Sequence, residues 1–271
     1  MKVLKHVLLL MVLTVTIVLS SCSNDDDNTL VLSESETYDI YDVNGSEVMG
    51  TVSLFNNDST AVVLTIQLAE ATGAVHPAAI YFDTANENGG LAITLNAISE
   101  DGFSATGFSA LDNGTDVTYL DMLDFNGNIK IDLSSSDNTT VAMGDIGQNA
   151  LTGNTVTRAL ESTNSSGVDG IVIFAERNNG GALIALEVEG TVTGNSHPVY
   201  LMNGSVATPG TTAATLNPII GEFGEGRTSI FTLDDGTPVL YSDLINFDGH
   251  INILLSDADA TIVSQGDIGV N

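Results

Sequence analysis

Basic residues are scarce in this sequence of 271 residues, which has 6 Lys and Arg against 35 Asp and Glu and a formal charge of −29. A protein that neutralises nucleic-acid phosphates needs a basic surface, so the composition excludes a nucleic-acid partner. The same charge argues against electrostatic attachment to an anionic membrane. Tryptophan is absent and aromatic residues make up only 6%, which is little for a protein that stacks ligands on aromatic rings.

Cysteine is almost absent too, since Cys22 is the only one, and an intrachain disulfide is therefore excluded. The sequence also lacks G-x-S-x-G, H-E-x-x-H and P-loop motifs, which mark common catalytic sites. We therefore predict that the protein is not an enzyme. Apolar residues make up 43% and charged residues 15%, which is typical of a chain that folds around a core.

The first 22 residues have the pattern of a bacterial lipoprotein signal peptide. Lys2 and Lys5 precede an apolar run of thirteen residues, 7–19, which is short for a membrane span and suits a signal peptide. The run ends in the sequence LSSC, which resembles a lipobox. We therefore predict a signal peptide over residues 1–21 and lipidation of Cys22, which would attach the protein to a membrane. The alternatives are an ordinary signal peptide and a short N-terminal anchor helix.

An acidic stretch follows this cysteine. Residues 23–28 read SNDDDN, and adjacent like charges favour a solvated tether, which we place at 22–36. The stretch resembles the surface-export signal of lipoproteins in the Bacteroidetes group. This resemblance implies an outer-membrane location, at the cell surface or at the periplasmic face.

The remaining sequence contains two copies of one unit. Residues 111–147 and 233–269 are identical at 20 of 37 positions without a gap, at an offset of 122. His76-Pro77 matches His197-Pro198 at an offset of 121. A unit of this length is a typical domain. We therefore predict two tandem domains, at 37–153 and 154–271.

Each unit has the alternating pattern of β-strands. Apolar residues at 62, 64, 66 and 68 share one face of a strand, and the second copy repeats the pattern at 182–188. The residues at 119–125 and 241–247 have helical spacing, which indicates a short helix or turn. The fold class predicted is all-β, with two antiparallel β-sandwiches or barrels and little helix. The strands that we expect cover 48–55, 60–69, 79–83, 91–96, 103–108, 128–133, 170–175 and 182–188.

Several motifs in order give the units a family likeness. Each has a His-Pro strand, a strand that ends in L-N, an F-[ND]-G-x-I-x-I strand and a closing GDIG. Together they resemble the CHRD domain, which is named for its occurrence in chordin and is common in bacterial secreted proteins. The resemblance covers nearly all of residues 37–271. It implies an immunoglobulin-like or superoxide-dismutase-like β-sandwich, and it implies no reaction.

The histidines depart from the family pattern. Members often have H-P-A-H-I-H, whereas the two copies here read HPAAIY and HPVYLM. Each copy therefore keeps one histidine of a cluster that could bind copper or zinc. His76 and His197, with Asp132 as a further ligand, are weak metal candidates, and we predict that no metal is bound. We expect each histidine to orient the start of a strand.

Acidic residues provide the other candidates. Asp145 and Asp267 of the GDIG motifs either form part of a binding site or, as we expect, accept backbone N–H groups in a closing turn. Calcium is weakly indicated by further aspartates in expected turns, whose spacing does not match an EF-hand. These aspartates are Asp112, Asp116, Asp121, Asp124, Asp234, Asp235, Asp243 and Asp248.

These observations favour a non-catalytic lipoprotein of the cell envelope, with two CHRD-like domains that form a binding or structural module. The expected partner is an extracellular protein or polymer. The alternatives are a metal-binding, dismutase-like protein and a calcium-stabilised adhesin.

Overall fold

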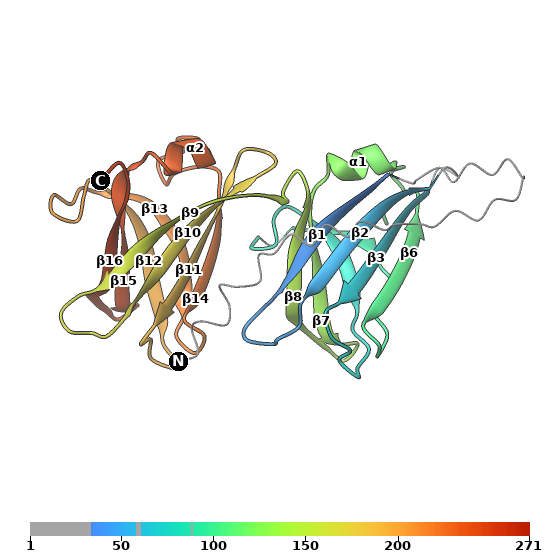
Figure 1. Cartoon of the computed structure of the whole chain (residues 1–271), viewed down its shortest axis with the longest axis horizontal. Coiled ribbons are helices and arrows are strands. Elements are labelled where there is room, and N and C mark those ends of the chain that lie inside the picture. The colour runs from blue at the N-terminus through green and yellow to red at the C-terminus, as the bar shows by residue number, and fades with distance from the viewer. Residues whose placement is uncertain (1–33, 58–60, 88) are drawn as a thin grey trace, which may run out of the picture. The chain divides into compact units, whose positions relative to one another are not determined.

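The structure is a computed structural model that describes residues 34–57, 61–87 and 89–271. These residues form sixteen strands and two short helices (Figure 1). The prediction of an all-β chain with little helix is confirmed. The predicted domain limits, 37–153 and 154–271, stay a prediction.

The first eight strands form one antiparallel sheet in the order β5-β4-β7-β8-β1-β2-β3-β6. Their bounds are β1 Ser35–Asp42, β2 Gly50–Asn57, β3 Ala61–Leu68, β4 Ala78–Phe82, β5 Leu91–Thr94, β6 Phe103–Phe108, β7 Asn126–Ser134 and β8 Asp137–Gly147. We call this set, with its loops, the first unit.

The next eight strands close into a barrel. Read from β13, their order is β13-β12-β15-β16-β9-β10-β11-β14, so that β9 takes the place of β1 and each other strand that of its counterpart. Their bounds are β9 Leu151–Ser162, β10 Asp169–Arg177, β11 Ala182–Glu189, β12 Ser196–Asn203, β13 Thr212–Ile220, β14 Glu225–Ile230, β15 Asp248–Ser256 and β16 Asp259–Gly269. We call this set the second unit. The repeat in the sequence is therefore also a repeat of topology.

Closure of the second unit depends on the pair Ile220↔Glu225 between β13 and β14. In the first unit β5 and β6 are not neighbours in the sheet, although the N–H of Ser99 donates to the carbonyl of Phe103 at 3.0 Å. The structure therefore has continuous antiparallel sheets, one open and one closed, where the sequence predicted a pair of sandwiches or barrels.

Alternation of apolar residues explains the best-predicted strands. In β3 the side chains of Val62, Leu64, Ile66 and Leu68 are all buried, as the period of two requires. Strand β7 buries Ile129 and Ile131, and its counterpart β15 buries Ile251 and Ile253. These four residues therefore occupy equivalent buried positions in the two copies.

Each unit has a hydrophobic core of its own. The buried apolar residues of the first core lie between Tyr38 and Ala150, and those of the second lie between Leu160 and Ile268. Burying a large aliphatic side chain contributes about 1.5–3 kcal/mol, so each core stabilises its own unit.

The helices α1 (Tyr119–Leu123) and α2 (Tyr241–Leu244) lie where helical spacing was predicted. Thr118 caps α1 through a reciprocal pair of hydrogen bonds with Asp121. The carboxylate of Asp243 accepts the N–H of Leu240 at 2.9 Å at the start of α2. These aspartates therefore hold helix ends.

The connection between the units is short and hydrogen-bonded. Strand β8 ends at Gly147 and β9 begins at Leu151. The N–H groups of Gln148 and Asn149 donate to the carbonyls of Phe125 and Ile146, at 3.0 and 3.2 Å. The expectation that the GDIG motifs form closing turns is wrong, because both motifs lie in strands, at the ends of β8 and β16.

Candidate functional site

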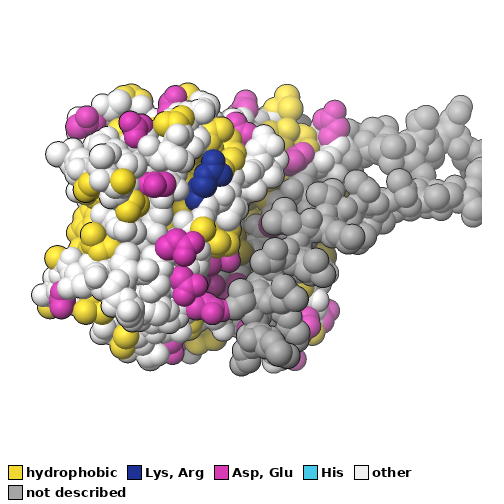
Figure 2. All heavy atoms as spheres, turned by 60° about the vertical axis from the view of Figure 1, so that its left-hand side comes forward, with side chains coloured by type: hydrophobic (Ala, Val, Ile, Leu, Met, Phe, Trp, Pro, Cys, Tyr) yellow, Lys and Arg dark blue, Asp and Glu magenta, His cyan; other side chains and the backbone are white. Residues whose placement is uncertain are grey.

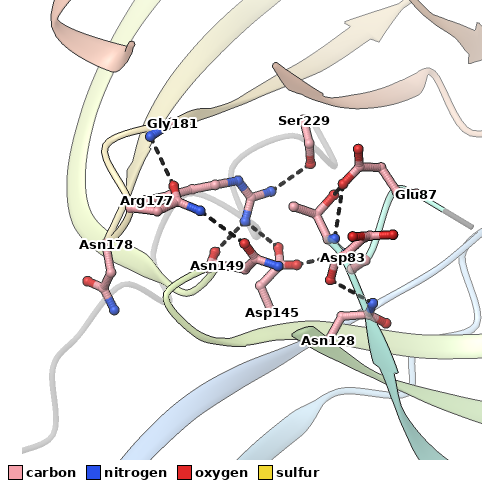
Figure 3. A network of polar contacts seen from close by, with 12 residues as sticks. Asp83, Glu87, Asn128, Asp145, Asn149, Arg177, Asn178, Gly181 and Ser229 are labelled. Atoms are coloured by element: carbon pink, nitrogen blue, oxygen red, sulfur yellow. Dashed lines mark hydrogen bonds and ion pairs between the residues drawn. The ribbon is translucent and has the colours of Figure 1, made fainter. Parts of the chain in front are cut away.

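A buried arginine joins the two units (Figure 3). Arg177, the last residue of β10, is 1% exposed, and its Nη1 atom lies 2.7 Å from Oδ2 of Asp145 in β8. The same Nη1 donates to the carbonyl of Asn149, and Nη2 donates to Oγ of Ser229 at 2.8 Å. One guanidinium therefore contacts three parts of the chain. These are β8, which is the last strand of the first unit, the connection, and β14 of the second unit.

The carboxylate of Asp145 is held from two sides. Its Oδ1 atom accepts the backbone N–H of Ala85 at 2.7 Å, and its Oδ2 atom faces Arg177. Burial raises the pKa of this carboxyl, whereas the Arg177 charge and the N–H of Ala85 favour the ionised form. A contact from this aspartate to a backbone N–H was expected from the sequence, whereas the ion pair with Arg177 was not.

Asp267 repeats half of this arrangement in the second unit. Its Oδ1 atom accepts the N–H of Val206 at 2.6 Å, as Asp145 accepts that of Ala85. Asp267 is exposed, and no ion pair of the described residues includes it. The backbone contact therefore belongs to the repeated fold, whereas the ion pair belongs to the junction between the units.

The turn after Arg177 adds further bonds across the junction. The N–H groups of Asn178 and Asn179 donate to the carbonyls of Ala150 and Gln148, both at 2.9 Å. The side-chain amide of Asn178 donates to the carbonyl of Gly147, also at 2.9 Å. The hairpin between β10 and β11 therefore binds the connection through its backbone as well as through Arg177.

Basic side chains are concentrated at this junction although they are rare in the chain. The described residues include four, Lys130, Arg158, Arg177 and Arg227. The guanidinium of Arg227 lies 4.5 Å from the centre of the Tyr41 ring, which belongs to the first unit. Basic groups are scarce and acidic groups scattered on the face in Figure 2. Two of these four basic side chains, those of Arg177 and Arg227, therefore contact groups of the first unit or of the connection.

A cleft lies beside this network, with a volume of about 300 Å³. Both units contribute to its lining, which consists of Asp42, Val43, Asn44, Asn86, Met143, Asn217, Pro218, Ile220, Glu225, Gly226 and Arg227. Some buried polar atoms near the junction have no hydrogen-bond partner among the described residues. They include Tyr41 Oη, Asn86 Nδ2, Asn149 Nδ2 and Arg177 Nε.

The Tyr41 hydroxyl has a raised pKa. Burial is the main cause, and the negative charge of Asp145 acts in the same direction. Arg227 and Arg177 oppose the shift, as does the nearby amide of Asn86, although the amide and the hydroxyl do not meet hydrogen-bond geometry. Tyr41 is therefore a neutral hydroxyl that has hydrogen-bonding capacity left.

His76 and His197 occupy equivalent positions in the structure. Both are buried, and the Nδ1 atom of each lies 3.0 Å from a backbone carbonyl, of Asp132 and Leu254 respectively. The Nε2 atom of His76 lies 2.9 Å from Oγ1 of Thr72, and that of His197 accepts the N–H of Val192 at 3.5 Å. Both nitrogens of each ring are therefore engaged by protein groups at the start of a strand.

The Asp132 carboxylate was considered as a ligand beside His76, but the contact is made by its backbone carbonyl. Its carboxylate instead accepts a long hydrogen bond, of 3.4 Å, from Thr140, and burial raises its pKa. Within the described ranges, no group of three or more His, Cys, Asp or Glu side chains is arranged to hold a metal ion.

We expect zinc to bind the protein no more tightly than a surface histidine would, because each ring nitrogen already contacts a protein group that zinc would have to displace. Calorimetric titration of the chain and of a His76→Ala, His197→Ala double variant should give the same weak signal. Sub-micromolar binding that disappears in the double variant would contradict this prediction.

Most of the aspartates considered for calcium hold turns and helix ends. Asp112 accepts the N–H of Thr94 at 3.0 Å, and Asp234 accepts that of Thr215 at the same distance. Asp235 accepts the N–H of Thr237, and Asp124 accepts the side-chain amide of Gln148. These carboxylates are therefore spread over separate local contacts.

Cys22 lies outside the described residues, as do the expected signal peptide and most of the tether. No helix in the described part of the chain has the length and apolarity to cross a membrane. Comparison with protein-family models, with curated proteins and with solved structures found no match.

Arg177 was not predicted from the sequence as a site residue. The sequence held one signal. An arginine at the end of the apolar stretch IVIFAER is unusual in a chain with so few basic residues. A buried arginine requires an acidic partner, but many acidic residues could have supplied it.

Proposed function

We propose that the chain is a non-catalytic lipoprotein of the cell envelope, in which two CHRD-like domains act together as one binding or structural module. The observation that carries the proposal is the network around Arg177. It fastens the two units through a buried ion pair and backbone hydrogen bonds. A fastened pair presents one continuous surface to a partner, which two domains on a free linker would not do.

The family likeness remains part of this proposal. The shared strand order of the two units supports tandem domains at 37–153 and 154–271. We propose that each is a variant of the immunoglobulin-like or superoxide-dismutase-like β-sandwich, with the sheet continued around the edge. The described histidines support a non-catalytic role, because His76, His197 and His250 are buried and bonded to backbone carbonyls.

We propose that lipidation of Cys22 attaches this module to the outer membrane, where its partner is an extracellular protein or polymer. The support is the LSSC sequence, followed by an acidic stretch. An anchor of this kind would suit a chain whose charge of −29 gives it no attraction to anionic lipids.

The substitution Cys22→Ala should move the protein from the membrane fraction to the soluble fraction, because it removes the acylated thiol. Fractionation of the native host and incorporation of labelled palmitate measure the two effects. A Ser21→Ala variant, which keeps a small residue before the cysteine, should stay lipidated. If the Cys22→Ala chain still partitions with membranes after its N-terminus is cleaved, the anchor is wrong.

Protease treatment of intact cells then separates the two orientations. A chain at the cell surface is degraded, whereas one at the periplasmic face is degraded only after the outer membrane is opened.

A further inference from the structure

The cleft between the units contains polar groups that the fold does not need. The side chain of Asn86 lines it, and its Nδ2 atom is buried without a partner among the described residues. Tyr41 does not line the cleft, but its ring contacts Arg227, which does, and its hydroxyl is also buried without a partner among the described residues. An unsatisfied buried polar group costs about 1–3 kcal/mol.

Comparison of the two units indicates that the repeated fold does not require these groups. The repeat places Ala207 where the first unit has Asn86, because Val206 makes the same contact as Ala85. It places Glu161 where the first unit has Tyr41, since Ile40 and Leu160 pair with equivalent glycines. The second unit therefore builds the same sheet with neither group, and of the two only Asn86 lines the cleft.

The lining of the cleft defines the chemistry of its ligand. Planar polar side chains, which are Asp42, Asn44, Asn86, Asn217, Glu225 and Arg227, supply both donors and acceptors. Met143, Pro218 and Ile220 supply apolar surface for C–H groups. A single cation beside two carboxylates suits neither a phosphate nor a divalent metal ion. A neutral molecule with many hydroxyl groups uses both the donors and the acceptors.

We propose that this cleft binds a neutral sugar, as a free mono- or disaccharide or as the end of a glycan. About 300 Å³ lies at the lower limit for small-molecule sites, which suits one or two sugar rings. Recognition depends on hydrogen bonds from polar lining side chains such as Asn86 and Arg227, because no aromatic side chain lines the cleft. The inference deepens the proposed function, since it names a polymer class that the module binds.

The test uses the chain with Cys22→Ala, so that membrane attachment plays no part. The probes are glucose, galactose, mannose, N-acetylglucosamine and their common disaccharides, with inorganic phosphate as the anionic comparison. Saturation-transfer NMR identifies ligands, and calorimetry measures affinity. We expect at least one sugar to bind with a Kd on the order of 0.1–1 mM, and the affinity to change little with salt.

Two variants locate the binding. Asn86→Ala and Arg227→Ala should each weaken it at least tenfold, whereas Arg158→Ala, which removes a half-buried arginine of β9 that does not line the cleft, should leave it unchanged. Asn86→Ala should fold normally, because the second unit has alanine at this place. No binding by any sugar, binding that neither cleft variant weakens, or a preference for phosphate would overturn the proposal. None of these results would bear on lipidation, which the fractionation of Cys22→Ala tests separately.

Discussion

The substitution Asp145→Ala should destabilise the folded chain by about 3–5 kcal/mol, because it leaves a buried arginine without its counter-charge. Arg177 is 1% exposed, so water cannot replace the carboxylate. The backbone N–H of Ala85 loses its acceptor in the same substitution. Denaturation in urea, followed by far-ultraviolet circular dichroism, measures the loss.

Asp267→Ala is the matched control. It removes the same contact to a backbone N–H, from Val206, at an exposed position and without an arginine. It should cost about 1 kcal/mol. Equal losses in the two variants would show that the ion pair contributes nothing.

A double variant isolates the pair itself. Adding Arg177→Met to Asp145→Ala removes the uncompensated charge, so the double variant should be more stable than the sum of the single losses predicts. A coupling of about 0.5–3 kcal/mol is typical of residues in contact. A coupling near zero would contradict the contact as described.

The substitution Gly147→Ala should cost about 2–5 kcal/mol. Gly147 has a φ of +61°, and a Cβ atom there would lie 2.2 Å from the carbonyl oxygen of Phe125. The strain of a positive φ costs about 1–2 kcal/mol, and overpacking adds about 1–3 kcal/mol. Thermal and urea unfolding measure the loss.

Two other glycines serve as controls for this prediction. Gly114 has a φ of +86° with nothing within 4 Å of an added Cβ, so Gly114→Ala should cost only the conformational part, about 1–2 kcal/mol. Gly269, at the equivalent position of the second unit, has a φ of +62°, and a Cβ atom there would lie 1.9 Å from the carbonyl oxygen of Phe247. Gly269→Ala should therefore be about as costly as Gly147→Ala. A loss for Gly147→Ala no larger than that for Gly114→Ala would contradict the close approach.

Sequence patterns predicted strands with a clear period of two, such as β3, and missed several strands without one. Strand β3 alternates buried and partly exposed residues and was predicted within one or two residues at each end. Strand β9 was missed because most of its side chains are exposed, so it carries no apolar period. Strands β8 and β16 were missed because their GDIG motifs resemble turns.

The junction could not be predicted from the repeat, because it depends on differences between the copies. Arg177 in β10 has Asn57 as its counterpart in β2, and Asp267 repeats Asp145 without an arginine opposite it. A repeat reveals what the copies share, which is their fold. The ion pair that joins them needs Arg177, which only one copy has.

Strand β1 gives the proposed anchor a mechanical consequence. The expected tether, 22–36, includes the first residues of β1, which begins at Ser35, and the other end of the strand, at Asp42, lines the cleft. A pull between the membrane and a bound ligand would therefore run along β1. Its six registered pairs with β2 lie side by side along that direction, so they would be loaded together in shear. Such an arrangement resists force better than one in which pairs open one after another.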